Sequence, residues 1–200
     1  MQQMSAEWSF YHPVRVVSTR LSSYLASISG KSLLLVTTEG FTRRGLTCNI
    51  VDWAGKNKLQ IYDHVRPNPD LDELDLALAS LRGQNFDYIL AVGGGSVIDA
   101  AKAFSIAVSL PIERPLSAIL RENLSVDFSR RIPVIAVPTT SGTGSEVTQY
   151  ATLWDLTNGL KYSLAGEQIF PQTAVLDFEL SLSLPRQETL YTGLDAVSHA

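Results

Sequence analysis

The sequence has 200 residues, of which 45% are hydrophobic and 18% are charged, and this balance favours one folded domain with a sizeable core over a disordered chain. The net charge of -4 and the lack of any Lys/Arg cluster larger than a pair argue against a nucleic-acid partner and for a small-molecule partner. The single cysteine excludes an intramolecular disulfide, and the absence of a membrane-length apolar run or a signal-peptide pattern predicts a cytoplasmic protein without membrane contact.

The first part of the chain alternates strand-like and helix-like patterns. We expect an opening strand within residues 8–17, a short helix over residues 21–28, and a strand over residues 32–37 that is buried on both faces. Ligands of open parallel sheets bind beyond the carboxyl ends of the strands, so Thr38 and the two residues after it are candidates for contacting a nucleotide ribose. An ordinary surface turn is the alternative for each of them.

The same alternation continues through the middle of the chain. Residues 58–65, 88–92 and 131–137 have the apolar patterns of strands, and residues 70–81 place leucines at the spacing of a helix that faces a core. Strands that alternate with helices in this way predict an α/β fold, with a parallel sheet flanked by helices.

Three glycines, residues 93–95, follow the apolar residues 88–92 and precede a helical pattern over residues 100–108. Residues without a Cβ let a ligand approach the main chain. Ser96 and Asp99 have the spacing of a capping box, which would start a helix with its free N–H groups facing the turn and favour a bound phosphate or pyrophosphate. Because this is not a GxGxxG fingerprint, packing of the glycines against neighbouring atoms is the alternative.

A second stretch, residues 138–148, is rich in hydroxyl side chains and directly follows the predicted strand at residues 131–137. Its Thr143 and Glu146 also have capping-box spacing, so we expect a second helix to start at the same crevice. The hydroxyl groups would then serve phosphate or ribose oxygens. A plain Ser/Thr/Gly loop is the alternative.

The next segment predicts a hairpin. Asn158-Gly159 lies between apolar and aromatic residues within the stretch 147–164, as in a two-residue turn. Lys161 follows this turn and is a candidate to reach back over a ligand, with a solvated surface lysine as the alternative.

The end of the chain predicts one more strand, over residues 174–177, and a final helix that opens at Pro185. Asp195 and His199 are four residues apart, which puts a carboxylate and an imidazole on one face of that helix. They are candidates for sharing a divalent metal, although two ligands do not complete a site and a hydrogen-bonded pair is the alternative.

Four motifs follow one another along the chain: Pro67-Asn68-Pro69; Gly93-Gly94-Gly95-Ser96 with Asp99 and Lys102; Pro138-Thr139-Thr140 with Gly142, Thr143 and Glu146; and Thr192-Gly193-Leu194-Asp195 with His199. In this order they resemble the iron-containing (group III) alcohol dehydrogenases, which are related to glycerol dehydrogenase and dehydroquinate synthase. The resemblance covers residues 32–200. It implies a Rossmann-like NAD(P)-binding domain, here residues 1–180, and the beginning of an all-helical metal-binding domain at residues 181–200. Because the helical pattern stops without a breaker, we expect the N-terminal portion of a longer protein.

The resemblance also implies roles for particular residues, with no catalytic side chain among them. It assigns the pyrophosphate to Gly94, Gly95 and Ser96, and the rest of the dinucleotide site to Thr38, Asn68, Asp99, Thr139, Thr140, Thr143, Thr148 and Lys161. It assigns Asp195 and His199 as the first two ligands of a ferrous iron or zinc ion, which the family holds with one aspartate and three histidines.

The implied activity is that of a metal-containing alcohol dehydrogenase or aldehyde reductase. In such an enzyme, hydride passes between NAD(P)H and a small alcohol or aldehyde whose oxygen the metal polarises. Thr38 stands where many NAD-preferring members have an aspartate, and Arg43 and Arg44 follow it, so we expect NADPH to be accepted. The stretch 38–45 is similar to a branch that reduces phosphonate aldehydes such as phosphonoacetaldehyde.

Two other functions stay open at this point. One is a dehydroquinate synthase-like lyase that uses tightly bound NAD and zinc, and the other is a non-catalytic nucleotide-binding module. Consumption of NAD(P)H with a simple aldehyde would exclude the lyase. We expect a homo-oligomer such as a dimer, although no sequence pattern fixes the number of subunits.

Overall fold

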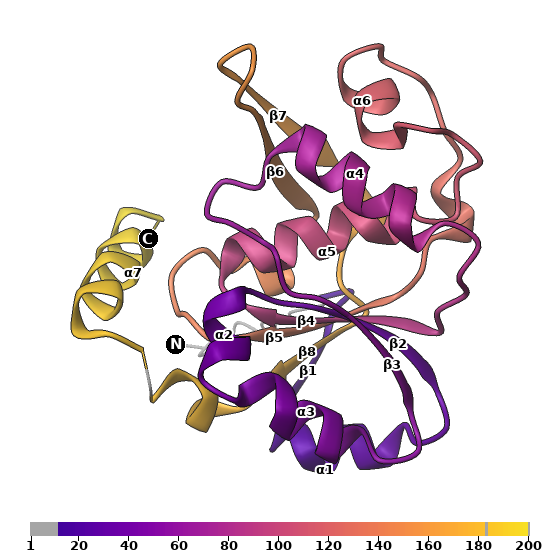
Figure 1. Ribbon diagram of the computed structural model, residues 1–200. Coiled ribbons are helices and arrows are strands. Elements are labelled where there is room, and N and C mark those ends of the chain that lie inside the picture. The colour runs from indigo at the N-terminus through magenta and orange to yellow at the C-terminus, as the bar shows by residue number, and fades with distance from the viewer. Residues whose placement is uncertain (1–11, 183, 200) are drawn as a thin grey trace, which may run out of the picture.

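A computed structural model describes residues 12–182 and 184–199. Its centre is a six-stranded parallel sheet in the order β1-β8-β5-β4-β2-β3 (Figure 1). The strands of this sheet are β1 (Arg15–Ser18), β2 (Ser32–Val36), β3 (Lys58–Tyr62), β4 (Tyr88–Gly93), β5 (Val134–Pro138) and β8 (Thr173–Leu176). The predicted α/β fold with a parallel sheet is confirmed.

Helices cover both faces of this sheet (Figure 1). One face carries α1 (Leu21–Ser27) and α3 (Leu46–Ala54), which follows the short α2 (Glu39–Arg43). The other face carries α4 (Leu71–Leu81), α5 (Gly95–Ala107) and α6 (Pro115–Leu120), and an antiparallel hairpin of β6 (Tyr150–Asp155) and β7 (Leu160–Ala165) packs against α5. The last helix, α7 (Arg186–His199), stands outside these layers (Figure 1). Within the described residues, no helix is both long and apolar enough to cross a bilayer.

Side chains of the sheet divide the core into two clusters. In β2, Leu33 and Leu35 belong to the cluster with α1 and α3, whereas Leu34 and Val36 belong to the cluster with α4 and α5. All four are fully buried. Successive side chains of a strand point to opposite faces, so a continuous apolar run is what a strand covered on both sides requires.

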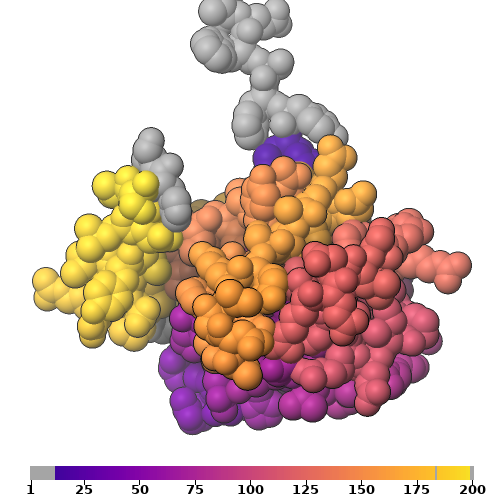
Figure 2. Space-filling model, turned by 90° about the horizontal axis from the view of Figure 1, so that it is seen from above, coloured from indigo at the N-terminus to yellow at the C-terminus, as the bar shows by residue number. Residues whose placement is uncertain are grey.

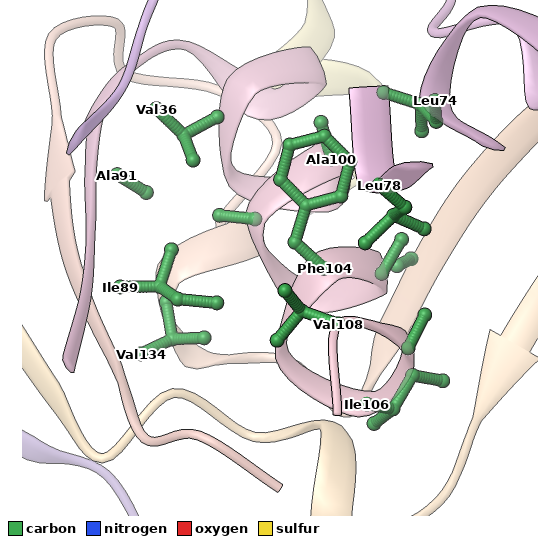
Figure 3. Close-up of a cluster of buried hydrophobic side chains, with 14 of the residues drawn as sticks. Val36, Leu74, Leu78, Ile89, Ala91, Ala100, Phe104, Ile106, Val108 and Val134 are labelled. Atoms are coloured by element: carbon green, nitrogen blue, oxygen red, sulfur yellow. The ribbon is translucent and has the colours of Figure 1, made fainter. Parts of the chain in front are cut away.

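Phe104 of α5 lies in the middle of the larger cluster (Figure 3). Its side chain is fully buried, and its ring meets the ring of Tyr62 edge-on with 5.2 Å between the centroids. Leu78 of α4 and Ile89 of β4 belong to the same cluster. Phe104 therefore packs α5 against both α4 and the sheet.

Several predicted boundaries need correction. The opening strand starts only at Arg15, after Pro13, whose ring nitrogen has no proton to donate to a sheet; residues 8–11 lie outside the described residues. The strand expected over residues 58–65 ends at Tyr62. The residues after Tyr62 turn back toward β2, where His64 makes an isolated bridge with Thr38.

Three helices, α2, α3 and α6, were not predicted from the sequence. Helix α3 contains β-branched and polar residues that are weak helix formers, and it is held by packing of its buried Ile50 against the α1 side of the core. Helix α6 is held through Asp75 of α4, whose carboxylate accepts hydrogen bonds from the N–H groups of Leu116 and Ser117 at 2.9 and 3.0 Å. Tertiary contacts stabilise these helices, so local sequence patterns are weak there.

Candidate functional site

A cavity of about 580 Å³ lies at the carboxyl edge of the sheet, beside the N-terminus of α5. It brings together residues from five separate parts of the chain. Its lining includes these residues from the predicted site: Asn68, Gly95, Ser96, Asp99, Thr143, Thr148, Lys161 and Asp195. Its other lining residues are Pro69, Ser145, Tyr150, Thr152 and Trp154.

Helix α5 begins directly after the glycines. Gly94 is its N-cap residue, and as a glycine it has no side chain that could cap the helix. The predicted capping box of Ser96 and Asp99 is therefore wrong: both residues lie inside the helix, because the helix begins earlier, at Gly95. An N-terminus without a side-chain cap leaves main-chain N–H groups free to bind an anion.

The glycine turn packs tightly against its surroundings. A Cβ on Gly93 would lie 2.5 Å from Cγ2 of Val97, so the packing alternative holds for this glycine. A Cβ on Gly94 would lie 3.0 Å from Oγ1 of Thr140, and a Cβ on Gly95 would lie 3.0 Å from the side chain of Thr143. The hydroxyl-rich loop, residues 138–148, thus lies directly against the N-terminus of α5.

This hydroxyl-rich loop does not start an α-helix. Gly144 adopts a left-handed conformation with φ 61°, and a single 3₁₀ turn over Ser145–Val147 follows it. Thr143 accepts a hydrogen bond from the N–H of Ser145 at 3.2 Å, and the chain then passes into β6. The predicted capping box of Thr143 and Glu146 is wrong, because the left-handed residue between them turns the chain away from an α-helical path.

Thr139 and Thr140 do not line the large cavity, although Thr140 lies against Gly94 at its edge. They line a smaller cavity of about 250 Å³, together with Glu146 and Asp177. Thr38 lines neither cavity; it is the N-cap residue of α2, next to His64. The structure thus separates the predicted residues into one main group at the large cavity and two outlying groups.

The hairpin of β6 and β7 forms one side of the large cavity. Trp154 and Lys161 face each other across the two strands, and the Lys161 Nζ lies 5.6 Å from the centroid of the Trp154 ring. The loop between the strands has four residues instead of the predicted two. Asp155 explains this, since its carboxylate accepts hydrogen bonds from both the main-chain and side-chain N–H groups of Asn158.

The hairpin is anchored by buried charge. The Asp155 side chain is fully buried and accepts a hydrogen bond from Nε of Arg121 at 2.7 Å, which holds the pKa of Asp155 well below its usual range. Arg121 also binds Asp72 of α4. Asp70, the N-cap residue of α4, accepts a hydrogen bond from the N–H of Leu156 at 3.1 Å. These bonds fix the side of the cavity that carries Lys161.

Helix α7 approaches the hydroxyl-rich loop from the other side, as a separate lobe in Figure 2. A Cβ on Gly142 would lie 2.5 Å from the carbonyl oxygen of Thr192 and 3.2 Å from Oδ2 of Asp195. Asp195 lines the cavity, while the side chain of His199, the second predicted metal ligand, lies outside the described residues. The part of the chain that the structure describes contains no group of three or more His, Cys, Asp or Glu side chains that could hold a metal. A metal site needs about three or four protein ligands, so these residues do not form a complete one.

The chain is similar to known proteins over most of its length. A family model described as "Iron-containing alcohol dehydrogenase" matches residues 15–178. The chain belongs to this family.

The chain spans about half the length of each of three relatives. It is 32% identical to the NADPH-dependent butanol dehydrogenase of Clostridium saccharobutylicum over 179 residues, which cover 88% of this chain and 46% of that protein. The solved structure of the sulfoacetaldehyde reductase of Bifidobacterium kashiwanohense in complex with NAD+ is 25% identical, with a TM-score of 0.81 over 96% of this chain and 51% of that one. The NADH-dependent butanol dehydrogenase A of Thermotoga maritima is 25% identical, with a TM-score of 0.79 over 96% of this chain and 50% of that one.

Lys102 of α5 belongs to one of the four motifs, but the sequence predicted no role for it. Its side chain is fully buried, and its Nζ donates hydrogen bonds to the carbonyl oxygens of Tyr150 at 2.6 Å and Thr148 at 2.9 Å. Burial lowers the pKa of Lys102 to about 8, and the nearby carboxylates of Asp99 and Glu146 oppose this shift. A lysine inside the run 100–108, which apart from Ser105 is otherwise apolar, is the sequence signal that could have found it.

We expect the free energy of unfolding to rise by roughly 2 kcal/mol between about pH 8 and pH 10 because of Lys102. The folded-state pKa of Lys102 is about 8, below the ordinary value of 10.5. In this interval the unfolded chain binds more protons than the folded chain, so a rising pH favours folding. Urea unfolding at a series of pH values measures the rise, and a Lys102→Met variant should lack it. Parallel pH curves for the two proteins would contradict this assignment.

Proposed function

We propose that this chain is the dinucleotide-binding part of a metal-containing alcohol dehydrogenase or aldehyde reductase that passes hydride between NAD(P)H and a small alcohol or aldehyde. The observation that carries the proposal is the large cavity. In a member of the iron-containing alcohol dehydrogenase family, it places the uncapped N-terminus of α5 beside hydroxyl groups and the ammonium group of Lys161.

Each part of this cavity suits a part of a dinucleotide. The main-chain N–H groups at Gly95 and Ser96 offer donors and a favourable helix dipole to the pyrophosphate. The hydroxyl groups of Thr143 and Thr148 suit ribose oxygens, and the Lys161 ammonium adds positive charge. For Gly94, Thr139 and Thr140, which lie at the edge of this arrangement, we keep the proposed role of contacting the same cofactor.

For the metal, this chain offers Asp195 and His199 as proposed ligands of iron or zinc. When bound, such an ion would polarise the substrate oxygen. Because two donors do not complete a site, the chain by itself accounts for cofactor binding and not for the metal-dependent step.

A fluorescence titration of NADPH and NADH onto the chain tests the proposal. Saturable binding with energy transfer from Trp154, which lines the cavity, is the expected result. A Trp154→Phe variant should keep the binding and lose much of the transfer. Absence of binding to either dinucleotide by the folded chain would overturn the proposal.

We expect a Thr38→Asp variant to shift the cofactor preference toward NADH by about tenfold. A carboxylate at the carboxyl end of β2 accepts a hydrogen bond from a ribose 2′-hydroxyl and repels a 2′-phosphate. Arg44 is the C-cap residue of the helix that Thr38 begins, its guanidinium carbon lies 4.9 Å from the centroid of the Phe41 ring, and it would offer positive charge to a 2′-phosphate. The ratio of the NADPH and NADH dissociation constants measures the shift.

The matched control is Thr38→Asn, which has nearly the same shape without the charge. Its preference should stay within about twofold of the wild type. The names of two relatives show that both cofactors are used in similar proteins, one NADPH-dependent and one NADH-dependent. If Thr38→Asp leaves the ratio of the NADPH and NADH dissociation constants unchanged, the ribose 2′-position of the bound cofactor lies away from residue 38.

For the substrate, we propose a small aldehyde, including one that carries an anionic group such as a phosphonate. A similar protein of solved structure is named a sulfoacetaldehyde reductase, whose substrate also joins an aldehyde to an anionic group. NADPH oxidation by a chain extended to the full length of the relatives, with acetaldehyde, butyraldehyde and phosphonoacetaldehyde compared, tests this. Turnover of simple aldehydes alone would exclude the phosphonate.

A further inference from the structure

Lys102 lies behind the cavity and contacts one short segment of its wall. Its Nζ donates to Oγ1 of Thr148 at 3.2 Å and to Oγ of Ser145 at 3.4 Å, besides the carbonyl oxygens of Thr148 and Tyr150. All these acceptors belong to residues 145–150, which line the cavity at Ser145, Thr148 and Tyr150. Lys102 itself is fully buried and does not line it.

Asp99 lies one turn earlier on α5 and holds the same segment from its other end. Its carboxylate accepts a hydrogen bond from Oγ of Ser145 at 2.5 Å and one from the N–H of Thr152 at 3.0 Å. Lys102 and Asp99 together therefore attach one wall of the cavity, residues 145–152, to helix α5. The N-terminus of α5 forms the opposite end of the cavity.

We propose that Lys102 is a positioning residue, which holds Ser145 and Thr148 in the geometry that receives the dinucleotide. This inference rests on the proposed function. Transferring an ammonium group from water into the protein interior costs free energy, and an apolar side chain would fill the same space at a lower free-energy cost. The hydrogen bonds that the ammonium makes to the cavity wall are what an apolar residue would lack.

Lys102 also orients the hydroxyl group of Thr148. An ammonium group only donates, so the Thr148 oxygen accepts from Lys102 and directs its own hydrogen elsewhere. Within the described residues, its acceptor is the carbonyl oxygen of Ser145 at 3.4 Å, which is a long hydrogen bond. A ribose or phosphate oxygen in the cavity would take this hydrogen at a shorter distance.

The experiment compares Lys102→Met with Ser105→Ala in the same 200-residue chain. Ser105 is a buried polar residue of the same helix that donates to the carbonyl oxygen of Ile132 and lies away from the cavity. At a temperature where each protein is folded, we expect Lys102→Met to weaken NADPH binding by about tenfold. Ser105→Ala should lower the thermal stability and leave the dissociation constant within about twofold of the wild type.

A double variant tests whether Lys102 acts through Thr148. Thr148→Val in the Lys102→Met background should weaken binding by less than about twofold further, although Thr148→Val alone weakens it severalfold. Lys102→Gln, which keeps two N–H donors without the charge, should recover part of the affinity. It also serves as the readout if Lys102→Met does not fold. Fully additive losses, or NADPH binding by Lys102→Met within about twofold of the wild type, would overturn the inference.

Amide hydrogen exchange separates this result from the proposed function. Residues 145–152 should exchange about tenfold faster in Lys102→Met than in Ser105→Ala, with or without a dinucleotide. If the wild type binds neither NADPH nor NADH, the proposed function fails, and the exchange rates still show whether Lys102 holds Thr148 in place. Unchanged exchange in this segment would overturn the positioning role.

Discussion

A Gly94→Asp variant is expected to bind NADPH about 100-fold more weakly than the wild type while remaining at least as stable. Gly94 is the N-cap residue of α5, with φ -82° and ψ -170°, so a residue with a side chain can adopt its backbone conformation. Asp is a favoured N-cap residue and should support the helix. Its carboxylate would occupy the N–H groups that are proposed to bind the pyrophosphate and would repel that anion. Fluorescence titration and thermal unfolding of the two proteins give both quantities.

Gly94→Ala is the matched control for this variant. Its Cβ would lie 3.0 Å from Oγ1 of Thr140, a contact that a small shift of the threonine relieves. We expect its NADPH affinity to fall by less than about tenfold. Equal losses in the two variants would mean that crowding, and not charge, controls the site. Binding by Gly94→Asp within about threefold of the wild type would place the pyrophosphate away from α5.

A Phe104→Ala variant is expected to lose about 3–5 kcal/mol of unfolding free energy, a large part of the stability of a typical domain. Phe104 is fully buried, and truncating it leaves a cavity between α5, α4 and the sheet (Figure 3). The edge-on contact with Tyr62 is lost as well. Urea unfolding followed by circular dichroism measures the change.

Two further variants define what this loss means. Leu76→Ala on α4 removes an apolar side chain that is 74% exposed, and its cost should stay below about 0.5 kcal/mol. Phe104→Leu keeps most of the buried volume and should cost roughly 1–2 kcal/mol. A loss below about 1 kcal/mol in Phe104→Ala would show that α5 is held to the sheet by other contacts.

The parallel sheet was predictable because its strands carry strong local signals. The run at residues 33–36 is apolar without interruption, and a strand covered on both faces explains its burial. The glycines at residues 93–95 predicted the start of a helix beside a ligand crevice, and α5 begins there. The two capping boxes failed because residue spacing alone does not say where a helix begins. Gly94 caps α5 before Ser96, and the left-handed Gly144 precedes a 3₁₀ turn.

The sequence by itself determined the α/β fold class, the glycine turn, and, through the order of four motifs, the family to which the chain belongs. The fold class and the glycine turn depend on neighbouring residues, so local patterns carry them, and the family is carried by the order of the motifs along the chain. Only the tertiary structure decided which predicted residues share a cavity, because Asn68, Ser96, Lys161 and Asp195 meet through contacts between distant segments. It alone decided the role of Lys102. The acceptors of its ammonium group lie more than 40 residues away in the sequence, and burying that charge is favourable only where the fold brings them to it.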